Sequence, residues 1–324
     1  MSDYLYDKTG DDAEVAELEG LLGGYAHRAP LRLPPPRRRR RWLAIAIPAA
    51  AVAIAAAIAL LVIGRDEAGR GCPGGGPGFA FAIKGAAARC GGAAAAAGTS
   101  GTLPVGAWLE TAAGAVADVR VADIGDLVVY GDSRLRLVGT GPDQHRLELA
   151  RGRLSARVLA PPRLFVIDTP VAAAVDLGCA YDLTVDADGH THLRVTSGAV
   201  SLEGKDGVVA YAPMGTEVVA VPGRGPGTPV AIDAAPAVRA AAARFDAGDA
   251  AAAMAVAVAA GPRDTVTLWN LLARTRGADR EAVFRALDAL SIRPEWVLEE
   301  DVLAGRPQAL EDWRQSLDGE WMMR

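Results

Sequence analysis

The sequence predicts a chain of several parts: a short N-terminal helix, one transmembrane helix, an exported all-β domain of sandwich or jelly-roll type, and a small all-α C-terminal domain. Three patterns indicate this. Residues 42–64 carry no charge, residues 101–230 alternate apolar and polar side chains, and from about residue 231 the apolar spacing becomes helical. The predicted parts are residues 1–41, 42–64, 65–100, 101–230 and 231–324.

Residues 1–41 are acidic early and basic late, and they contain the segment "DDAEVAELEGLLGGY". Carboxylates at Asp11 and Asp12 favour a helix start, because they oppose the positive end of the helix dipole. The apolar residues that follow have 3,4 spacing and form one stripe: Val15, Leu18, Leu21 and Leu22. A helix this short cannot bury its stripe alone. We therefore expect these four side chains to bind a partner, with a disordered tail as the alternative.

Residues 42–64 are predicted to cross a bilayer. At about 1.5 Å per residue the run covers the roughly 30 Å hydrocarbon core, and Trp42 is placed like an interfacial anchor. A buried Ala-rich helix of a soluble domain is the alternative, but a run of charged residues against its edge argues against it. These residues are Arg37, Arg38, Arg39, Arg40 and Arg41.

The charged flanks predict the orientation of this span. The 15 residues before it hold seven arginines, whereas the 15 after it hold two, Arg65 and Arg70. The positive-inside rule then places the N-terminus in the cytoplasm and the long C-terminal part in a periplasm. Abundant Ala, Gly, Arg and Val with little Lys indicate a high-GC bacterial source, so the expected location is a bacterial inner membrane.

Residues 65–100 are rich in Gly and Ala and are predicted to be a flexible linker with one strand at "FAFAIKG". All three cysteines, Cys72, Cys90 and Cys179, follow the span, where disulfides can persist. An odd number allows at most one internal pair. We expect Cys90 to pair with Cys179, because both lie near the β-rich region. A buried free thiol and a Cys72–Cys90 loop are the alternatives.

Residues 101–230 show the alternation of half-buried antiparallel strands, separated by Gly, Pro and Asp turns. The segment "DADG" at 186–189 predicts a hairpin turn, since Asp and Gly tolerate positive φ. From 231 onward we expect two Ala-rich helices broken near Gly248, followed by further amphipathic helices. Three tryptophans are expected in their core rather than on a ligand platform: Trp269, Trp296 and Trp313.

No catalytic motif is present: the sequence lacks a phosphate loop, an HExxH pattern and a nucleophile elbow. We therefore predict neither enzyme activity nor a cofactor, and a net charge of −5 does not favour nucleic acid. His190 and His192 share a strand face near Asp186 and Asp188. No third strong ligand is evident beside the two histidines, so no metal is predicted.

Several segments between Gly101 and Thr228 resemble the FecR-domain family of membrane regulators. They are "LPVGAWLET", "VADIGDLVVYGDSRLRLV", "LELARGRLSARV", "RLFVIDTPVAAAVDLGCAYDLTV" and "LRVTSGAVSL". The chain departs from the family at Gly178–Cys179–Ala180–Tyr181, where Gly-Thr-x-Phe is more frequent. Tyr181 still supplies an aromatic ring, and Cys179 replaces a hydroxyl.

This resemblance implies signal transfer across an inner membrane. The exported domain would receive a state from an envelope protein, and the tail would bind an extracytoplasmic-function sigma factor through Val15, Leu18, Leu21 and Leu22. The tail is shorter than a full anti-sigma domain and lacks a zinc-binding His/Cys set. The alternative function is an envelope scaffold or ligand-binding module whose tail only sets the membrane orientation.

Overall fold

The computed structural model describes Cys72 and residues 76–322. Within this part no helix is both long and apolar enough to cross a membrane. The predicted tail helix and the predicted span at 42–64 lie outside the described residues.

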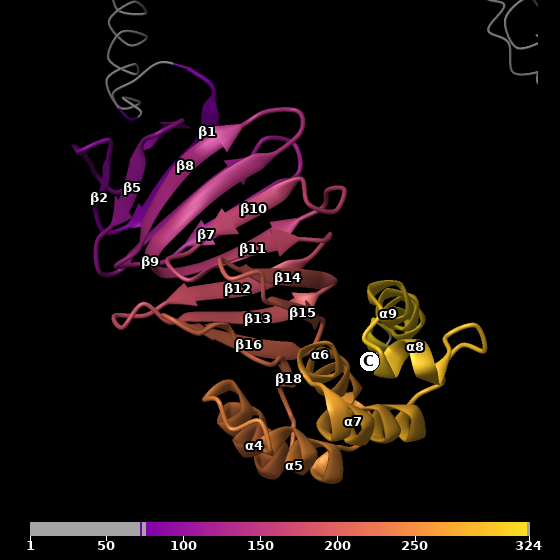
Figure 1. Ribbon diagram of the computed structural model, residues 1–324. Coiled ribbons are helices and arrows are strands. Elements are labelled where there is room, and N and C mark those ends of the chain that lie inside the picture. The colour runs from indigo at the N-terminus through magenta and orange to yellow at the C-terminus, as the bar shows by residue number, and fades with distance from the viewer. Residues whose placement is uncertain (1–71, 73–75, 323–324) are drawn as a thin grey trace, which may run out of the picture. The chain divides into compact units, whose positions relative to one another are not determined.

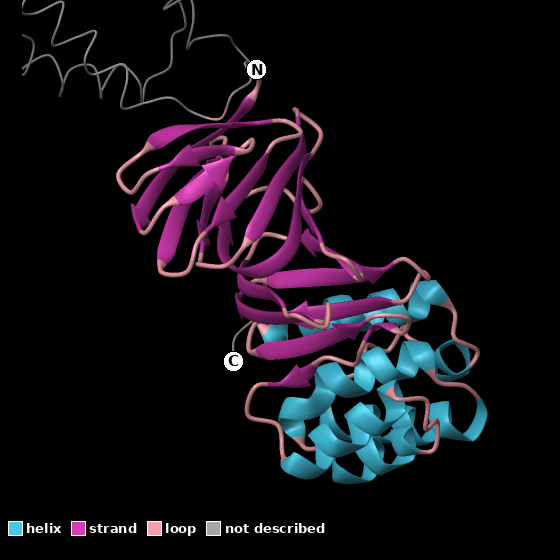
Figure 2. Ribbon diagram, turned by 90° about the vertical axis from the view of Figure 1, so that its left-hand side faces the viewer, coloured by secondary structure: helices cyan, strands magenta, loops and turns pink. Residues whose placement is uncertain are grey.

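Eighteen strands of the described part form two sheets (Figures 1 and 2). In chain order they are β1 (Gly78–Gly85), β2 (Ala88–Cys90), β3 (Ala93–Ala95), β4 (Ser100–Pro104), β5 (Trp108–Thr111), β6 (Ala115–Val121), β7 (Gly125–Val129), β8 (Arg134–Thr140), β9 (His145–Val158), β10 (Phe165–Asp168), β11 (Ala172–Asp176), β12 (Ala180–Val185), β13 (Thr191–Ser197), β14 (Ala199–Gly204), β15 (Val209–Pro213), β16 (Thr216–Val221), β17 (Gly225–Pro226) and β18 (Val230–Ala231).

One sheet has the order β4-β1-β6-β7-β9-β12-β13-β16, and β16 also pairs with the short strands β17 and β18. The other has the order β3-β2-β5-β8-β9-β10-β11-β14-β15. All of these pairs are antiparallel except β9 with β10.

The long strand β9 belongs to both sheets. Its residues 145–151 pair with β8, and its residues 152–157 pair with β12. Gly152, at the change of sheet, has φ +92°, and a Cβ there would lie 2.4 Å from the Ser133 Cα. Only glycine fits this position, since it has no Cβ to clash with Ser133 and adopts positive φ without strain.

The two sheets enclose one apolar core, as the alternating sequence predicts. Leu135 and Leu137 of β8, and Leu154 of β9, are fully buried in the same cluster as Leu183 of β12. The predicted all-β domain is therefore confirmed for residues 78–231.

The segment expected to be a linker differs from that prediction, because it carries β2 and β3 besides β1. Ala88, Cys90 and Ala95 are buried in the core of the β domain. Such short side chains give no visible alternation of hydrophobicity. Their burial depends on partners such as β5, which the local sequence does not reveal.

The helical region follows the last strand (Figure 1). It consists of α4 (Pro236–Asp246), α5 (Ala252–Ala259), the 3₁₀ helix η2 (Pro262–Asp264), α6 (Thr265–Arg274), α7 (Gly277–Leu290), α8 (Glu299–Leu303) and α9 (Pro307–Trp321). The expected break lies between α4 and α5, where Gly248 has φ +105°. Trp313 is fully buried and its ring meets Phe284 edge to face, with centroids 5.7 Å apart.

The helices join the β domain at β15, which has a single strand neighbour among the described residues. On α6, Asn270 Oδ1 accepts the Tyr211 backbone N–H at 3.0 Å, and its Nδ2 donates to the Tyr211 carbonyl at 3.0 Å. Asn270 is only 2% exposed. One amide side chain therefore takes the place of a neighbouring strand at this edge.

Candidate functional site

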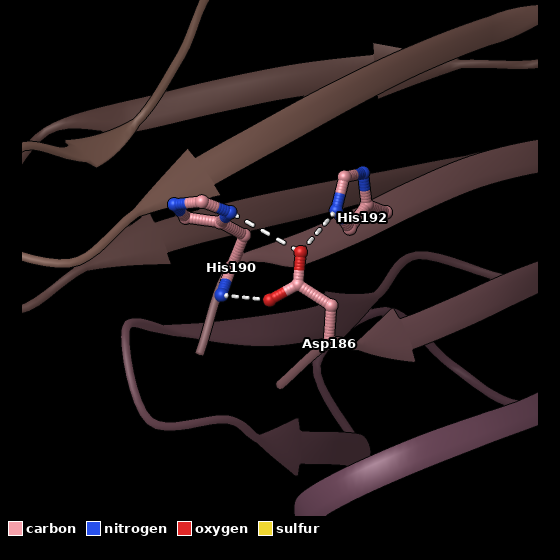
Figure 3. Close-up of side chains that lie close together, drawn as sticks. All are labelled: Asp186, His190 and His192. Atoms are coloured by element: carbon pink, nitrogen blue, oxygen red, sulfur yellow. Dashed lines mark hydrogen bonds and ion pairs between the residues drawn. The ribbon is translucent and has the colours of Figure 1, made fainter. Parts of the chain in front are cut away.

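Asp186, His190 and His192 meet at the tip of the β12–β13 hairpin (Figure 3). His190 Nδ1 and His192 Nε2 each lie 3.1 Å from the same carboxylate oxygen, Asp186 Oδ2. All three side chains reach solvent, with exposed fractions of 35% for His190, 47% for His192 and 34% for Asp186. The trio is therefore assembled by the fold and open to ligands.

The hairpin backbone holds the Asp186 carboxylate in place. Its other oxygen, Oδ1, accepts the backbone N–H groups of Asp188 at 3.0 Å and of His190 at 2.9 Å. Gly189 supplies the positive φ of +80° that closes the turn. Because Oδ1 is occupied, Oδ2 is left to face the two imidazoles.

These contacts lower the pKa of the Asp186 carboxyl to about 2. The largest cause is the hydrogen bond from His192, and the bonds from the His190 backbone and ring act in the same direction. Asp186 is thus anionic at neutral pH.

The sequence predicted the hairpin turn and the common face of His190 and His192, and the structure confirms both. It did not single out Asp186 as a third ligand. Asp188, the other carboxylate of the turn, contacts the cluster through its backbone N–H. The sequence feature that points to Asp186 is its position as the first residue of the turn. An Asp side chain there accepts hydrogen bonds from the backbone N–H groups of the residues that follow.

The predicted Cys90–Cys179 disulfide is wrong. Cys72 bonds to Cys90, with a Cα–Cα distance of 4.9 Å, and Cys179 is a free, buried thiol. Cys90 lies on β2, paired with β3 and β5, whereas Cys179 immediately precedes β12. The alternative of a Cys72–Cys90 loop is the one that the structure has.

Cys179 is a packing residue rather than a reactive thiol. Burial, together with the adjacent Asp176 carboxylate, raises its pKa, so the thiolate form is suppressed. Its Sγ donates to Asp176 Oδ1, and Asp176 Oδ2 accepts the Gly178 backbone N–H at 2.9 Å. The thiol therefore serves as a buried hydrogen-bond donor to Asp176.

The tryptophans only partly follow the prediction. Trp313 is buried, and Trp269 is half-buried with its Nε1–H donating to the Leu310 carbonyl at 3.1 Å. Trp296, however, is 73% exposed, so its expected place in the core is wrong. It lies between α7 and α8 with Ile292 and Leu298, which are 78% and 47% exposed. Trp296 lies in a loop, where helical periodicity does not determine which side chains are buried. The expectation of a core position assumed a helix here.

The remaining predicted site residues lie outside the described part of the chain. They are the tail stripe Val15, Leu18, Leu21 and Leu22, and the flanking arginines Arg37, Arg38, Arg39, Arg40 and Arg41.

Comparison with known proteins identifies a family match for part of the chain. Residues 107–201 match the family of FecR proteins. Two crystal structures of a candidate anti-sigma factor from Parabacteroides distasonis ATCC 8503 are similar to part of the chain, each with 16% identity and a TM-score of 0.33. The similarity covers 36% of this chain and 56% of theirs, so this chain spans about half the length of those structures, and a similarity this low supports no function. No curated protein matches the chain.

The matched range begins one residue before β5 and ends within β14. It contains the hairpin with Asp186, His190 and His192. It also contains β9, the strand common to both sheets. Residues 107–201 are therefore identified as a FecR domain by their match to that family.

Proposed function

We propose that the chain is a single-pass regulator of a bacterial inner membrane, whose exported FecR domain transmits an envelope signal to a cytoplasmic sigma factor. The observation that carries this proposal is the FecR domain at residues 107–201, placed after a charge-free run and a basic flank. In this proposal the chain acts through protein–protein contacts and not through catalysis.

The Cys72–Cys90 disulfide supports the exported placement of the residues after the span. Structural disulfides persist in oxidising compartments such as the periplasm and are rare in the cytosol. Cys72 lies only eight residues after Gly64, the end of the predicted span, so the oxidising side would begin close to the membrane.

The cytoplasmic contact is proposed for the tail stripe. Val15, Leu18, Leu21 and Leu22 would lie in a groove of the sigma factor, as amphipathic helices do in helix-in-groove complexes. The arginines at 37–41 would keep this helix on the cytoplasmic side.

The test is a pulldown from cell lysate with residues 1–41, comparing the wild-type tail with a Leu18→Asp, Leu21→Asp double variant. An Ala13→Asp, Ala16→Asp double variant is the matched control, because it adds the same charge on the opposite helix face. We expect a sigma factor with the wild-type tail and the control, and none with the stripe variant. Equal recovery by all three tails, or no sigma factor at all, would contradict the proposal.

A scaffold function is the second candidate, and the exposed apolar group at Ile292, Trp296 and Leu298 favours it. The three residues belong to one short segment between α7 and α8, and large apolar side chains exposed there could contact another protein. In that case deletion of residues 1–30 leaves envelope associations unchanged, whereas deletion of the helical region abolishes them. Crosslinking of the full chain in cells would distinguish the two outcomes.

A further inference from the structure

We propose that the tip of the β12–β13 hairpin binds one divalent transition-metal ion of the zinc class, with Asp186, His190 and His192 as its protein ligands. The proposal rests on the geometry of the hairpin alone and is independent of any sigma-factor role. The ligand atoms would be Asp186 Oδ2, His190 Nδ1 and His192 Nε2.

The spacing of the three atoms suits a single ion. Each ring nitrogen lies 3.1 Å from Asp186 Oδ2, and all three atoms lie within 4.8 Å of one another. With zinc bonds of about 2.0–2.1 Å, ligand atoms of a tetrahedral site are separated by about 3.3 Å. An ion can therefore touch all three atoms after only small rotations of exposed side chains.

The fold preorganises these ligands. Thr191, between the two histidines, is fully buried and its hydroxyl donates to Thr169 Oγ1 at 2.8 Å. His190 directly precedes β13 and His192 is its second residue, so they flank the buried Thr191 and both reach the surface, with 35% and 47% of their side chains exposed. The backbone bonds to Asp186 Oδ1 fix the carboxylate, in the way that outer-shell contacts orient metal ligands.

The chemistry of the donors selects the class of ion. Two imidazoles and one carboxylate suit zinc, copper or nickel, whereas calcium and magnesium prefer sites made of oxygen ligands. Three protein ligands leave a fourth position for water or for a donor from another molecule, and the half-exposed rings leave a path for entry.

Isothermal titration of the full-length protein in detergent with zinc sulfate tests the site. The protein is purified through a tag without histidine, treated with a chelator and then dialysed. The variants are Asp186→Asn, His190→Gln and His192→Gln. Asp188→Asn is the matched control, because it removes a carboxylate from the same turn but not from the cluster.

We expect one zinc per wild-type chain and no comparable binding of magnesium. Since loss of an outer-shell partner alone costs about 10- to 100-fold in metal affinity, each ligand variant should bind at least about tenfold more weakly, with Asp188→Asn unchanged. Circular dichroism of the zinc-free variants checks that they are folded. Absence of zinc binding by the wild type, or equal binding by folded ligand variants, would show that the trio is only a hydrogen-bonded turn and overturn the proposal.

Discussion

Asp176 and Asp186 lie in the same domain, but their surroundings shift their carboxyl pKa values in opposite directions. Asp186, at the surface, accepts bonds from His192 and His190, and its pKa falls to about 2. Asp176 is fully buried, and desolvation raises its pKa despite the bonds from Cys179 and Gly178. The contribution of Asp186 to stability is therefore present above the unfolded value of 3.8 and lost as the pH falls towards 2.

For Asp176 the pH dependence of the contribution to stability has the opposite sign. A carboxyl whose pKa is raised on folding contributes stability below the unfolded value of 3.8, and this contribution is lost as the pH rises through the folded pKa. Asp176→Asn keeps an oxygen for the Gly178 N–H but cannot ionise. We expect the unfolding free energy of Asp176→Asn, relative to wild type, to increase from pH 4 to pH 7, because only the wild type loses stability as its buried carboxyl ionises.

Urea unfolding followed by tryptophan fluorescence at the two pH values measures this difference. Asp188→Asn makes the same change of charge in an exposed turn and serves as the control. A difference between wild type and Asp176→Asn that stays constant with pH would contradict the assignment of a raised pKa to Asp176.

At the scale of elements, the important contact is the one that ends the second sheet. A free strand edge exposes unpaired N–H and C=O groups and invites pairing with other chains. Here α6 covers β15, with Asn270 bonded to both backbone groups of Tyr211. The Tyr211 hydroxyl donates to Asp318 Oδ1 at 2.7 Å, so α9 is held at the same residue.

Asn270→Leu should therefore destabilise the junction strongly. It leaves the Tyr211 N–H and C=O without partners, and a buried polar group left unpaired costs about 1–3 kcal/mol, so a loss of at least about 2 kcal/mol is expected. Denaturant unfolding gives the free energy, and hydrogen exchange at the Tyr211 amide reports the opened edge. The control is Gln315→Leu on exposed α9 surface. A loss no larger than that of the control would show that α6 covers the edge by packing alone.

At the scale of the whole molecule, one disulfide ties the start of the described chain to the β domain. Cys72 and Cys90 are 18 residues apart, and Cys90 lies in the core. Closing a loop of this size removes entropy from the unfolded chain, which contributes about 3 kcal/mol. Cys179, the third cysteine, lies on the inside of the same domain and is protected from oxidants.

Reductant should accordingly destabilise the wild-type protein by about 2–4 kcal/mol. Cys179→Ala should keep this sensitivity, whereas Cys72→Ser should lose it. A thiol reagent should modify no cysteine in the native protein. After unfolding without reductant it should modify one cysteine per chain, Cys179. Modification of Cys179 in the native state, or sensitivity to reductant in Cys72→Ser, would contradict the pairing.

Several features follow from the sequence because they depend on neighbouring residues. The alternation of Leu135 and Leu137, the turn at 186–189 and the break at Gly248 each reflect the local conformational preferences of a few side chains, and the structure has all three. The resemblance to FecR proteins is carried by short segments of the sequence. Most of them lie within residues 107–201, the range that matches the family.

Other features depend on contacts between residues far apart in the chain. By itself, the sequence determined the strand-rich and helical halves and the common face of His190 and His192. Only the tertiary structure decided that Cys90 meets Cys72, that β9 serves two sheets, that Asn270 covers β15 and that Asp186 completes the trio. Periodicity records which side of a strand faces the core, but partners are selected by the packing of the whole domain.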